Sequence, residues 1–542
     1  MSNIPFVGLH AHSVAGSIFD GFGYPNEHMD YAYSNGSDAL ALTDHGNMNG
    51  LSWQVLHAKK MRSEGKDFKP IYGCEAYFVP SIAGWREEYE RVMADKKAAR
   101  AAKKAETSGA TVEDEGASKK ASRNILNRRR HLVLLAQNQK GLNNLFKLIS
   151  ESYKAENFYR YPRIDFDLLE KHNEGIIASS ACLGGVYAGC YWENFEEGEE
   201  AILEAMRDTT RRFLEVFGDR WYGELQWNNV PEQHKLNSYI IKMHKEFGIP
   251  LISTADSHYP NPDAWKDREL YKRLGWLGKG RPSWATDDEL PVSVDEIGYE
   301  LYPKNGEQMW ESYKKYSSEC GASYDDGLVL SSITETHKIA HERIETFYPD
   351  NTVRLPDFVV PAGETADSAL RKLCFEGLRA AASRGLLEDE RYTDRLEYEL
   401  GVIADRGFSK YFLTMNEISR ITNEVMLAGT GRGSAAGSLV AYTLGITQVD
   451  PIKFGLQFER FLRSDAVDYP DIDYDVSDPM ALKDLLIERW GDNTVAPISN
   501  WNTLQLKSLI KDISKLYGIP FTESNAVTGK MMVEATSAAK KA

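Results

Sequence analysis

Cysteine, long apolar runs and net positive charge are all scarce in this chain. Its 542 residues include only 5 cysteines, scattered along the sequence, which is too few for a disulfide framework and typical of a reducing compartment. No apolar stretch approaches the roughly 20 residues that a helix needs to cross a bilayer. The opening MSNIPFVGLHAHS also lacks the basic and apolar regions of a signal peptide. We therefore expect a cytoplasmic protein without a membrane partner.

Acidic residues outnumber basic ones, 80 against 64, which gives a net charge of −16. This balance weakly disfavours a nucleic-acid binder, because neutralising phosphates requires Lys and Arg. Binding depends on local patches, however, so the overall charge leaves nucleic acid open as a partner. With 42% hydrophobic and 27% charged residues, the chain has the composition of a soluble globular protein. Its length predicts two to four domains.

Short apolar runs alternate with helical stretches over residues 1–275. Strands that alternate with helices predict parallel βα units, and this many units favour a barrel-like α/β domain. Functional groups are then expected at the C-terminal ends of the strands. The predicted strands lie in residues 39–46, 69–79, 130–138, 174–185 and 249–259.

One segment, residues 86–130, interrupts this pattern with an Ala-, Lys- and Glu-rich composition. It predicts a solvated insertion, partly helical and partly disordered. Its basic ends could contact nucleic acid, although a charged surface excursion is the favoured interpretation. Beyond residue 275 the pattern is mostly helical, with amphipathic stretches at 365–385 and 395–407 and a helical tail from 482.

Potential metal ligands stand at the ends of the predicted strands. His10 and His12 are two residues apart, on one face of a strand, and Asp256 and His258 repeat that spacing. His, Asp, Glu and a lone Cys suit zinc, manganese or iron. There are too many ligands for one tetrahedral site, so two or three ions are expected, and adjacent ions can clamp both oxygens of a phosphate ester in hydrolysis. Any one of these residues alone could be an ordinary polar strand end. The other potential ligands at predicted strand ends are Asp20, Asp44, His45, Glu75, His131 and Cys182.

A glycine-rich segment near residue 430 predicts a phosphate-binding loop. Residues 428–442 read AGTGRGSAAGSLVAY, and glycines let backbone N–H groups turn inward while a following helix N-terminus adds positive charge. Arg432 could contact a phosphate oxygen. The pattern is neither a Walker A motif nor a Rossmann fingerprint, and a glycine-rich turn by itself is about as often merely a turn.

An acidic segment, YPDIDYDVSD at residues 469–478, follows this loop. On an extended strand the alternating Asp471, Asp473 and Asp475 share one face, and because like charges repel we expect a cation there. Magnesium prefers such carboxylate oxygens. With Arg460 near the loop, the set could hold a triphosphate and activate a 3′-hydroxyl for in-line attack.

The sequence resembles a known family along nearly its whole length. The motifs FVGLHAHSVAGSIFDG, ALTDHG, YGCEAYF, HLVLLAQNQKGLNNLFKL, SSACLGG and STADSHY resemble, in order, those of the polymerase and histidinol phosphatase (PHP) domain. The version that opens the alpha subunit of bacterial DNA polymerase III, a C-family replicative polymerase, is the most similar. The later GTGRGSAAGSLVAYTLGITQVDP, FERFL and YPDIDYD are similar to the palm of the same family.

The resemblance implies a fold and a set of site residues. It implies an α/β PHP domain, a distorted βα barrel, at 1–275, then the first part of an α+β palm at 276–490 and the start of a helical thumb at 491–542. In the palm it implies catalytic Asp471 and Asp473, with magnesium, and Asp475 as support. Its triphosphate loop falls on Arg432, Gly433 and Ser434, and Asp44 is expected only to orient a neighbour. The implied PHP ligands of zinc or manganese are His10, His12, Asp20, His45, Glu75, His131, Cys182, Asp256 and His258.

The function that the resemblance implies is template-directed addition of deoxynucleotides to a DNA primer, with a 3′ to 5′ proofreading exonuclease in the PHP domain. The family draws a third aspartate and its fingers from later in the sequence. We therefore expect a second polypeptide to complete a split polymerase, an arrangement plausible in viruses of bacteria. Two alternatives stay open: a stand-alone PHP phosphoesterase whose palm only holds DNA, and a non-catalytic remnant or interaction module.

Overall fold

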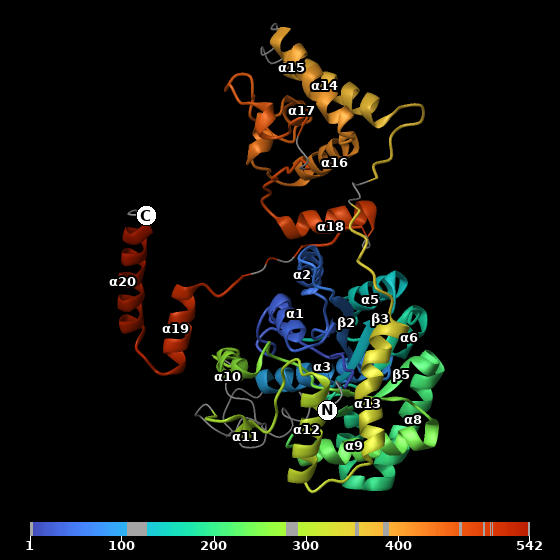
Figure 1. Ribbon diagram of the computed structural model, residues 1–542. Coiled ribbons are helices and arrows are strands. Elements are labelled where there is room, and N and C mark those ends of the chain that lie inside the picture. Colours follow the sequence, from blue (N-terminus) through green and yellow to red (C-terminus); the bar gives the residue numbers. More distant parts are fainter. Residues whose placement is uncertain are drawn as a thin grey trace. The chain divides into compact units, whose positions relative to one another are not determined.

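The chain divides into two compact units, residues 1–350 together with 504–542, and residues 351–503 (Figure 1). Helices α12 and α13 contribute Met309 and Val329 to the same core as Leu132 and Trp221. The structure thus places in the first unit two helices that the sequence analysis assigned to the palm. This computed structural model describes residues 4–105, 127–277, 291–352, 357–382, 390–465, 469–491, 494–498, 500 and 502–539.

A six-stranded sheet forms the centre of the first unit, with its strands in chain order from β1 to β6. The pairs β1–β2, β4–β5 and β5–β6 are parallel, whereas β3 runs antiparallel to both of its neighbours. Nearly every strand residue is buried, as expected where helices cover a sheet. The strands are β1 (Ala39–Leu42), β2 (Lys69–Phe78), β3 (Arg130–Ala136), β4 (Ile176–Ser179), β5 (Trp221–Gln226) and β6 (Leu251–Thr254).

The N-terminal segment joins the two edges of this sheet. Gly8 pairs with Leu40 of β1, and Ala11 pairs with Ser257 just after β6, both in parallel orientation. The backbone N–H of His12 donates to the carbonyl of Ser257 at 2.7 Å. Because one segment is bonded to both edges, the curled sheet closes and leaves no free edge there. The distorted βα barrel expected from the sequence is confirmed.

Helices cover the outside of the barrel, as α5, α6, α8 and α9 do around the strands in Figure 1. In α5 the side chain of Asn138 caps the first turn, and Leu142, Leu145 and Leu148 are buried on one face, the spacing of an amphipathic helix. The helices of this unit are α1 (Pro25–Ser34), α2 (Leu51–Ser63), α3 (Ile82–Ala105), α5 (Gln139–Ser152), α6 (Phe166–His172), α7 (Val186–Glu193), α8 (Glu199–Phe217), α9 (Pro231–Phe247), α10 (Trp265–Leu274), α11 (Val294–Ile297), α12 (Gly306–Glu319), α13 (Asp326–Lys338), α19 (Leu506–Leu516) and α20 (Phe521–Ala539).

The predicted insertion begins inside helix α3. Trp85 and Val92 are buried, so the start of this helix packs onto the barrel rather than projecting freely. The partly helical character predicted for residues 86–130 is confirmed up to Ala105. The part from 106 to 126 lies outside the described residues. Among the described helices, none combines the length and the apolar character that a membrane crossing requires.

The second unit is helical around its own core, which includes Leu370, Ile403, Phe412 and Leu439. The described residues of this unit contain no β-strand and a single β pairing, an isolated antiparallel bridge between Ala428 and Val476. The palm sheet expected from the sequence is therefore not found in this part, and the acidic segment is extended chain beside a loop. The helices are α14 (Ala366–Ala382), α15 (Glu390–Asp405), α16 (Ser409–Val425), α17 (Leu439–Thr443) and α18 (Pro479–Trp490), with short 3₁₀ turns η5 (Ser434–Gly437) and η6 (Phe458–Arg460).

Candidate functional site

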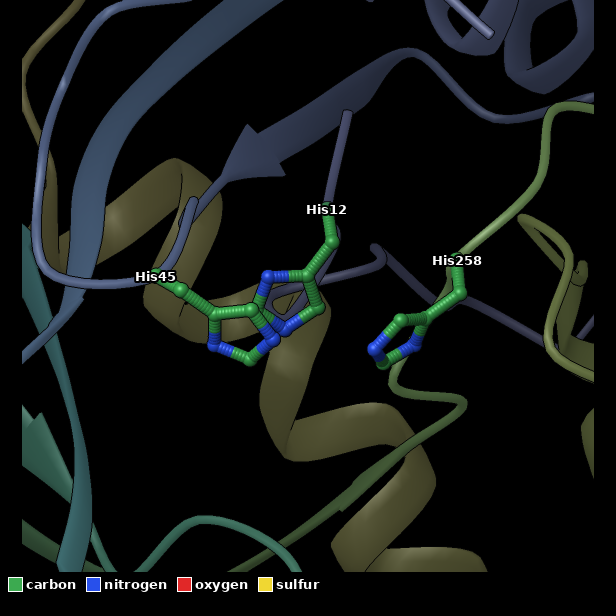
Figure 2. A group of neighbouring side chains, drawn as sticks. All are labelled: His12, His45 and His258. Carbon is green, nitrogen blue, oxygen red and sulfur yellow. The ribbon is translucent and has the colours of Figure 1, made fainter. Parts of the chain in front are cut away.

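The nine candidate ligands of the first unit lie together, most of them at strand ends or in the loops that follow them. The rings of His12, His45 and His258 face one another (Figure 2). The ring of His12 is 4.1 Å from that of His45 and 4.4 Å from that of His258, centroid to centroid. Among these nine residues, three groups have ligand atoms within 4.8 Å of one another: His12, His45 and His258; His10, His12 and Asp256; and His45, Glu75 and His131.

Glu75, from β2, lies at the centre of this cluster. Its Oε1 is 3.3 Å from Nε2 of His10 and 3.0 Å from Nδ1 of His131. Its Oε2 is 2.5 Å from Nδ1 of His45. The side chain is fully buried, so these contacts are made out of reach of bulk water. One carboxylate thus contacts histidines from three different parts of the barrel.

The remaining ligand candidates extend the cluster on both sides. Oδ1 of Asp256 is 3.2 Å from Nε2 of His10 and 3.1 Å from Nε2 of His12. Oδ2 of Asp20 is 3.1 Å from Nε2 of His45 and 3.5 Å from Nε2 of His258. Sγ of Cys182 is 3.7 Å from Nδ1 of His131. All nine residues singled out from the sequence are therefore brought together.

Several of these buried ligand atoms lie within ion-pair distance of one another and yet form no hydrogen bond. Leaving buried polar atoms without hydrogen bonds is unfavourable, and native proteins avoid it. Imidazole nitrogens and carboxylate oxygens that converge on one space in this way match the ligand preferences of zinc and manganese. The residues present therefore fit the ions that the sequence predicts. The atoms without a hydrogen bond are His10 Nε2, His12 Nε2, His45 Nδ1, Glu75 Oε2 and Asp256 Oδ1.

Burial and charge oppose each other at these groups. Burial lowers the pKa of His10, but Asp256 and Glu224 raise it well above its usual value. Burial and the charges on His45 and His258 hold the pKa of His12 well below its usual value. Burial raises the pKa of Glu75, but the neighbouring histidines, His131 first, hold it well below the usual range. Glu75 is therefore ionised at neutral pH and available to a cation.

Backbone strain accompanies two of the ligands. Asp256 follows β6 with a φ of 47°, and Ala181, which precedes Cys182, has a φ of 58°. Residues other than glycine rarely adopt this left-handed conformation, which costs about 1–3 kcal/mol and is concentrated at functional sites. The strained turns aim the Asp256 and Cys182 side chains into the cluster rather than along their strands.

In the second unit, the acidic segment keeps the predicted alternation although it joins no sheet. Asp471, Asp473 and Asp475 are exposed, whereas Ile472 is buried and Tyr474 half-buried. The backbone N–H of Ile472 donates to a tyrosine hydroxyl of α16 at 3.2 Å. One side of the segment is thus fixed to the helical core, and the three carboxylates share the solvent side.

The glycine-rich loop lies directly beside these carboxylates. The N–H of Gly429 donates to the carbonyl of Asp475 at 2.9 Å, and the guanidinium of Arg432 is 3.1 Å from the Asp475 carboxylate. Gly433 has a φ of 63°, and a Cβ built there would lie 2.4 Å from a carboxylate oxygen of Asp473. Only glycine allows that approach. The loop and the acids therefore come together as the sequence predicts, with Ser434 next in the loop.

The structure corrects one expectation about this loop. The N-terminus of α17 is already occupied, because the buried Glu399 carboxylate accepts from the N–H groups of Leu439 and Val440 at 3.0 Å each. It also accepts from the hydroxyl of Ser438 at 2.9 Å. The sequence analysis expected this helix N-terminus to help bind phosphate. That expectation is wrong, because Glu399 already occupies the N-terminus. Arg460 is exposed on η6, and no hydrogen bond or ion pair links it to the loop within the described residues.

Comparison with known proteins identifies the family. A PHP domain model matches residues 8–228, and a model described as the bacterial DNA polymerase III alpha NTPase domain matches residues 368–542. The DNA polymerase III subunit alpha of Aquifex aeolicus is 34% identical over 534 residues, which covers 96% of this chain. The chain belongs to the DNA polymerase III alpha subunit family. It spans about 40% of the length of the curated relatives that it matches, and it corresponds to their N-terminal part.

Further relatives agree with this assignment. The DNA polymerase III alpha subunits of Borreliella burgdorferi and Thermus aquaticus are 32% and 28% identical, covering 96% and 98% of this chain and 40% and 43% of their own length. Among solved structures, an amidohydrolase from Chromobacterium violaceum covers 49% of this chain and 96% of its own, with a TM-score of 0.24 and 16% identity. That likeness is too low to carry an argument.

Sequence reasoning missed Glu224, which holds His10 in place in this alpha-subunit relative. Its Oε1 lies 2.7 Å from Nδ1 of His10, and the hydroxyls of Ser179 and Thr254 donate to the same carboxylate at 2.6 Å each. A carboxylate accepts only, so Nδ1 carries the proton and Nε2 is left for a metal. A charged residue inside the strand segment WYGELQ was the available signal.

Two more residues orient ligands from behind. Buried Arg268 donates to Oδ1 of Asp20 at 2.7 Å and to its backbone carbonyl at 2.8 Å. Asp44 accepts from the hydroxyl of Ser17 at 2.9 Å, and that oxygen lies 3.2 Å from Nδ1 of His12. Burial raises the pKa of Asp44 to about 6. Asp44 therefore acts on His12 through Ser17, the orienting kind of role expected from the sequence.

Proposed function

We propose that this chain is the N-terminal portion of a replicative DNA-directed DNA polymerase, and that its PHP cluster hydrolyses phosphodiesters as a 3′ to 5′ proofreading exonuclease. The observation that carries the exonuclease is the convergence of nine ligand-type side chains on one space, where five buried nitrogen and oxygen atoms form no hydrogen bond. The family assignment supports the polymerase. DNA and deoxynucleoside triphosphates are the substrates that follow from it.

Two or three zinc or manganese ions are proposed for the cluster. Glu75 and Asp256 each contact more than one histidine, so these two carboxylates would hold the ions together with those histidines. When bound, such ions polarise a phosphoryl oxygen and lower the pKa of a bound water to about 7, so that hydroxide is available at neutral pH. Cys182 supplies the soft ligand that favours zinc.

The protein groups around the ions have separate tasks. Glu224 keeps the proton on Nδ1 of His10, which leaves Nε2, beside Glu75 and Asp256, as the atom that would bind an ion. Ser17 does the same for His12, and Arg268 fixes the orientation of Asp20. Full burial of Glu75 and His10 keeps bulk water from competing and strengthens their interaction with cations.

For the second unit, we infer nucleotide binding at the loop that holds Arg432, Gly433 and Ser434, with magnesium on Asp471 and Asp473. The juxtaposition of loop and carboxylates supports this. Arg432 is paired with Asp475 across an exposed surface, and exposed pairs of this kind are weak. Its guanidinium can therefore exchange to a triphosphate. The second polypeptide expected to complete the polymerase site stays a prediction.

One experiment tests both activities. A 5′-labelled primer on a template is incubated with the chain, four deoxynucleoside triphosphates, magnesium, and manganese or zinc. We expect shortening of the primer that is at least 100-fold slower in Asp256→Asn and unchanged in Asp473→Asn. Absence of shortening by the metal-loaded wild type would contradict the exonuclease. Lengthening that disappears in Asp473→Asn would mean that the chain polymerises without a partner, and shortening without lengthening would fit the stand-alone phosphoesterase as well.

A further inference from the structure

Three consecutive arginines lead into β3 and the ligand His131. Side chains alternate along an extended strand, so Arg129 shares a face with His131, whereas Arg128 and Arg130 face the other way. The ion pairs agree with this alternation. Arg128 is 3.5 Å from the carboxylate of Glu193 at the end of α7, and Arg130 also pairs with that carboxylate. Two of the three arginines therefore share one carboxylate on the side away from His131.

Arg129 lies over two aromatic rings. Its Cζ lies 3.7 Å from the ring centroid of Tyr161 and 5.0 Å from that of Tyr77. One guanidinium nitrogen donates to the carbonyl of Asn127 at 3.2 Å, and the buried Nε has no partner. No carboxylate of the described residues forms an ion pair with it. A guanidinium placed over aromatic rings still has N–H donors for a phosphate.

Tyr77 connects this arginine to the cluster. Its ring centroid is 5.5 Å from that of His131 and 6.1 Å from that of His45, with the His45 ring stacked at 14°. Tyr161 packs edge-on against Tyr77 at 5.3 Å. Arg129 is thus one aromatic ring away from two proposed ligands, close to the cluster but not part of it. That offset suits a phosphate next to the one being hydrolysed.

We propose that Arg129, seated on Tyr161 and Tyr77, binds the phosphate adjacent to the scissile one on a single DNA strand. This inference rests on the proposed exonuclease and names its substrate class. A substrate with one phosphate has nothing for Arg129 to bind, so the arginine selects polynucleotides over small phosphate esters. It acts as a binding residue and takes no part in the bond cleavage.

The test compares Arg129→Gln with the matched control Arg128→Gln. The substrates are a 5′-labelled single-stranded oligonucleotide and the p-nitrophenyl ester of thymidine 5′-monophosphate, which lacks the adjacent phosphate. In Arg129→Gln we expect KM for the oligonucleotide to rise about tenfold with kcat within twofold, and both constants for the small ester to stay unchanged. Arg128→Gln should match the wild type on both substrates. A manganese content equal to that of the wild type confirms that each variant keeps its metal cluster.

Oligonucleotide binding with the metal chelated gives a second readout that does not depend on hydrolysis. Fluorescence anisotropy across a salt series should show the slope of log K against log salt falling by about 0.7 in Arg129→Gln, the value for one phosphate contact on single-stranded DNA. The inference is overturned if Arg129→Gln equals Arg128→Gln, or if both substrates lose activity equally. If the wild type hydrolyses neither substrate, the exonuclease fails, while the anisotropy difference still decides whether Arg129 binds DNA phosphate.

Discussion

At the scale of single residues, the arrangement of the metal centre depends on carboxylates that are not themselves ligands. Glu224 receives three donors besides His10, including the amide of Gln226 at 3.1 Å. It is buried and rigidly held. Its partner His10 presents Nε2 to both Glu75 and Asp256. Removing the carboxylate therefore disturbs the ring that contacts both Glu75 and Asp256.

Glu224→Gln should weaken manganese binding by roughly 10–100-fold, the usual effect of losing a partner that orients a metal-bound histidine. The amide can donate to Nδ1, which releases the proton to Nε2 and blocks the ligand atom. Competition with a fluorescent chelator measures the affinity. The matched control is Gln226→Ala, which removes one donor to Glu224 and should lower the affinity less than threefold. Equal affinities of Glu224→Gln and wild type would contradict the role of Glu224.

A second residue-scale prediction concerns the glycine that touches the acidic segment. Gly433→Ala should abolish binding of a magnesium–deoxynucleotide complex, because the new Cβ would meet Asp473 at 2.4 Å. The control is Gly445→Ala, which has a similar positive φ of 73° but nothing within 4 Å of the added Cβ. Equilibrium dialysis with labelled nucleotide compares the two. Equal losses would mean that backbone strain, not the approach to Asp473, determines the result.

At the scale of secondary-structure elements, sequence periodicity predicted the features that depend on neighbouring residues alone, such as which side chains of an extended segment share a face. The strand-end positions of His10, His12, Asp256 and His258 followed from a period of two and from the βα pattern. The alternation of the acidic segment followed from the same period, although the segment joins no sheet. Contacts between distant parts were not predictable. Glu399 occupies the N-terminus of α17 from 40 residues upstream in the chain, and no periodicity reports such a contact.

The Glu399 cap should be a major stabilising contact of the second unit. Glu399→Ala leaves two buried N–H groups and Arg395, which donates to Glu399 at 2.7 Å, without their acceptor. We expect a loss of about 3 kcal/mol in the free energy of unfolding of this unit. The control Glu397→Ala, an exposed position on the same helix, should cost less than about 0.5 kcal/mol. Urea denaturation monitors both, and equal midpoints would contradict the cap.

At the scale of the whole molecule, the net charge of −16 gave little guidance on nucleic-acid binding. The proposed phosphate contacts come from single arginines, Arg129 near the metal cluster and Arg432 in the glycine-rich loop, and an overall charge does not reveal them. The division of the chain was also not foreseen. Helices α12 and α13 have the same amphipathic pattern whichever unit they join, and only their burial with the barrel core assigns them. The barrel and the family, by contrast, were both predictable, because the motifs occur in order along nearly the whole chain.

Because each unit has its own hydrophobic core, the two sites should respond separately to substitution. Asp473→Asn should abolish binding of the magnesium–nucleotide complex and leave manganese binding by the PHP cluster unchanged. Asp256→Asn should do the reverse. Calorimetric titration of each variant with each ligand measures this. Loss of both ligands in either variant would contradict independent sites.

The central claim is that nine side chains from the barrel form one centre for two or three ions. Anomalous X-ray diffraction from crystals soaked in manganese tests it most directly. The account predicts two or three anomalous peaks within bonding distance of Glu75, Asp256 and the surrounding histidines, and the loss of at least one peak in Asp256→Asn. Peaks confined to other parts of the protein, or none at saturating manganese, would contradict it.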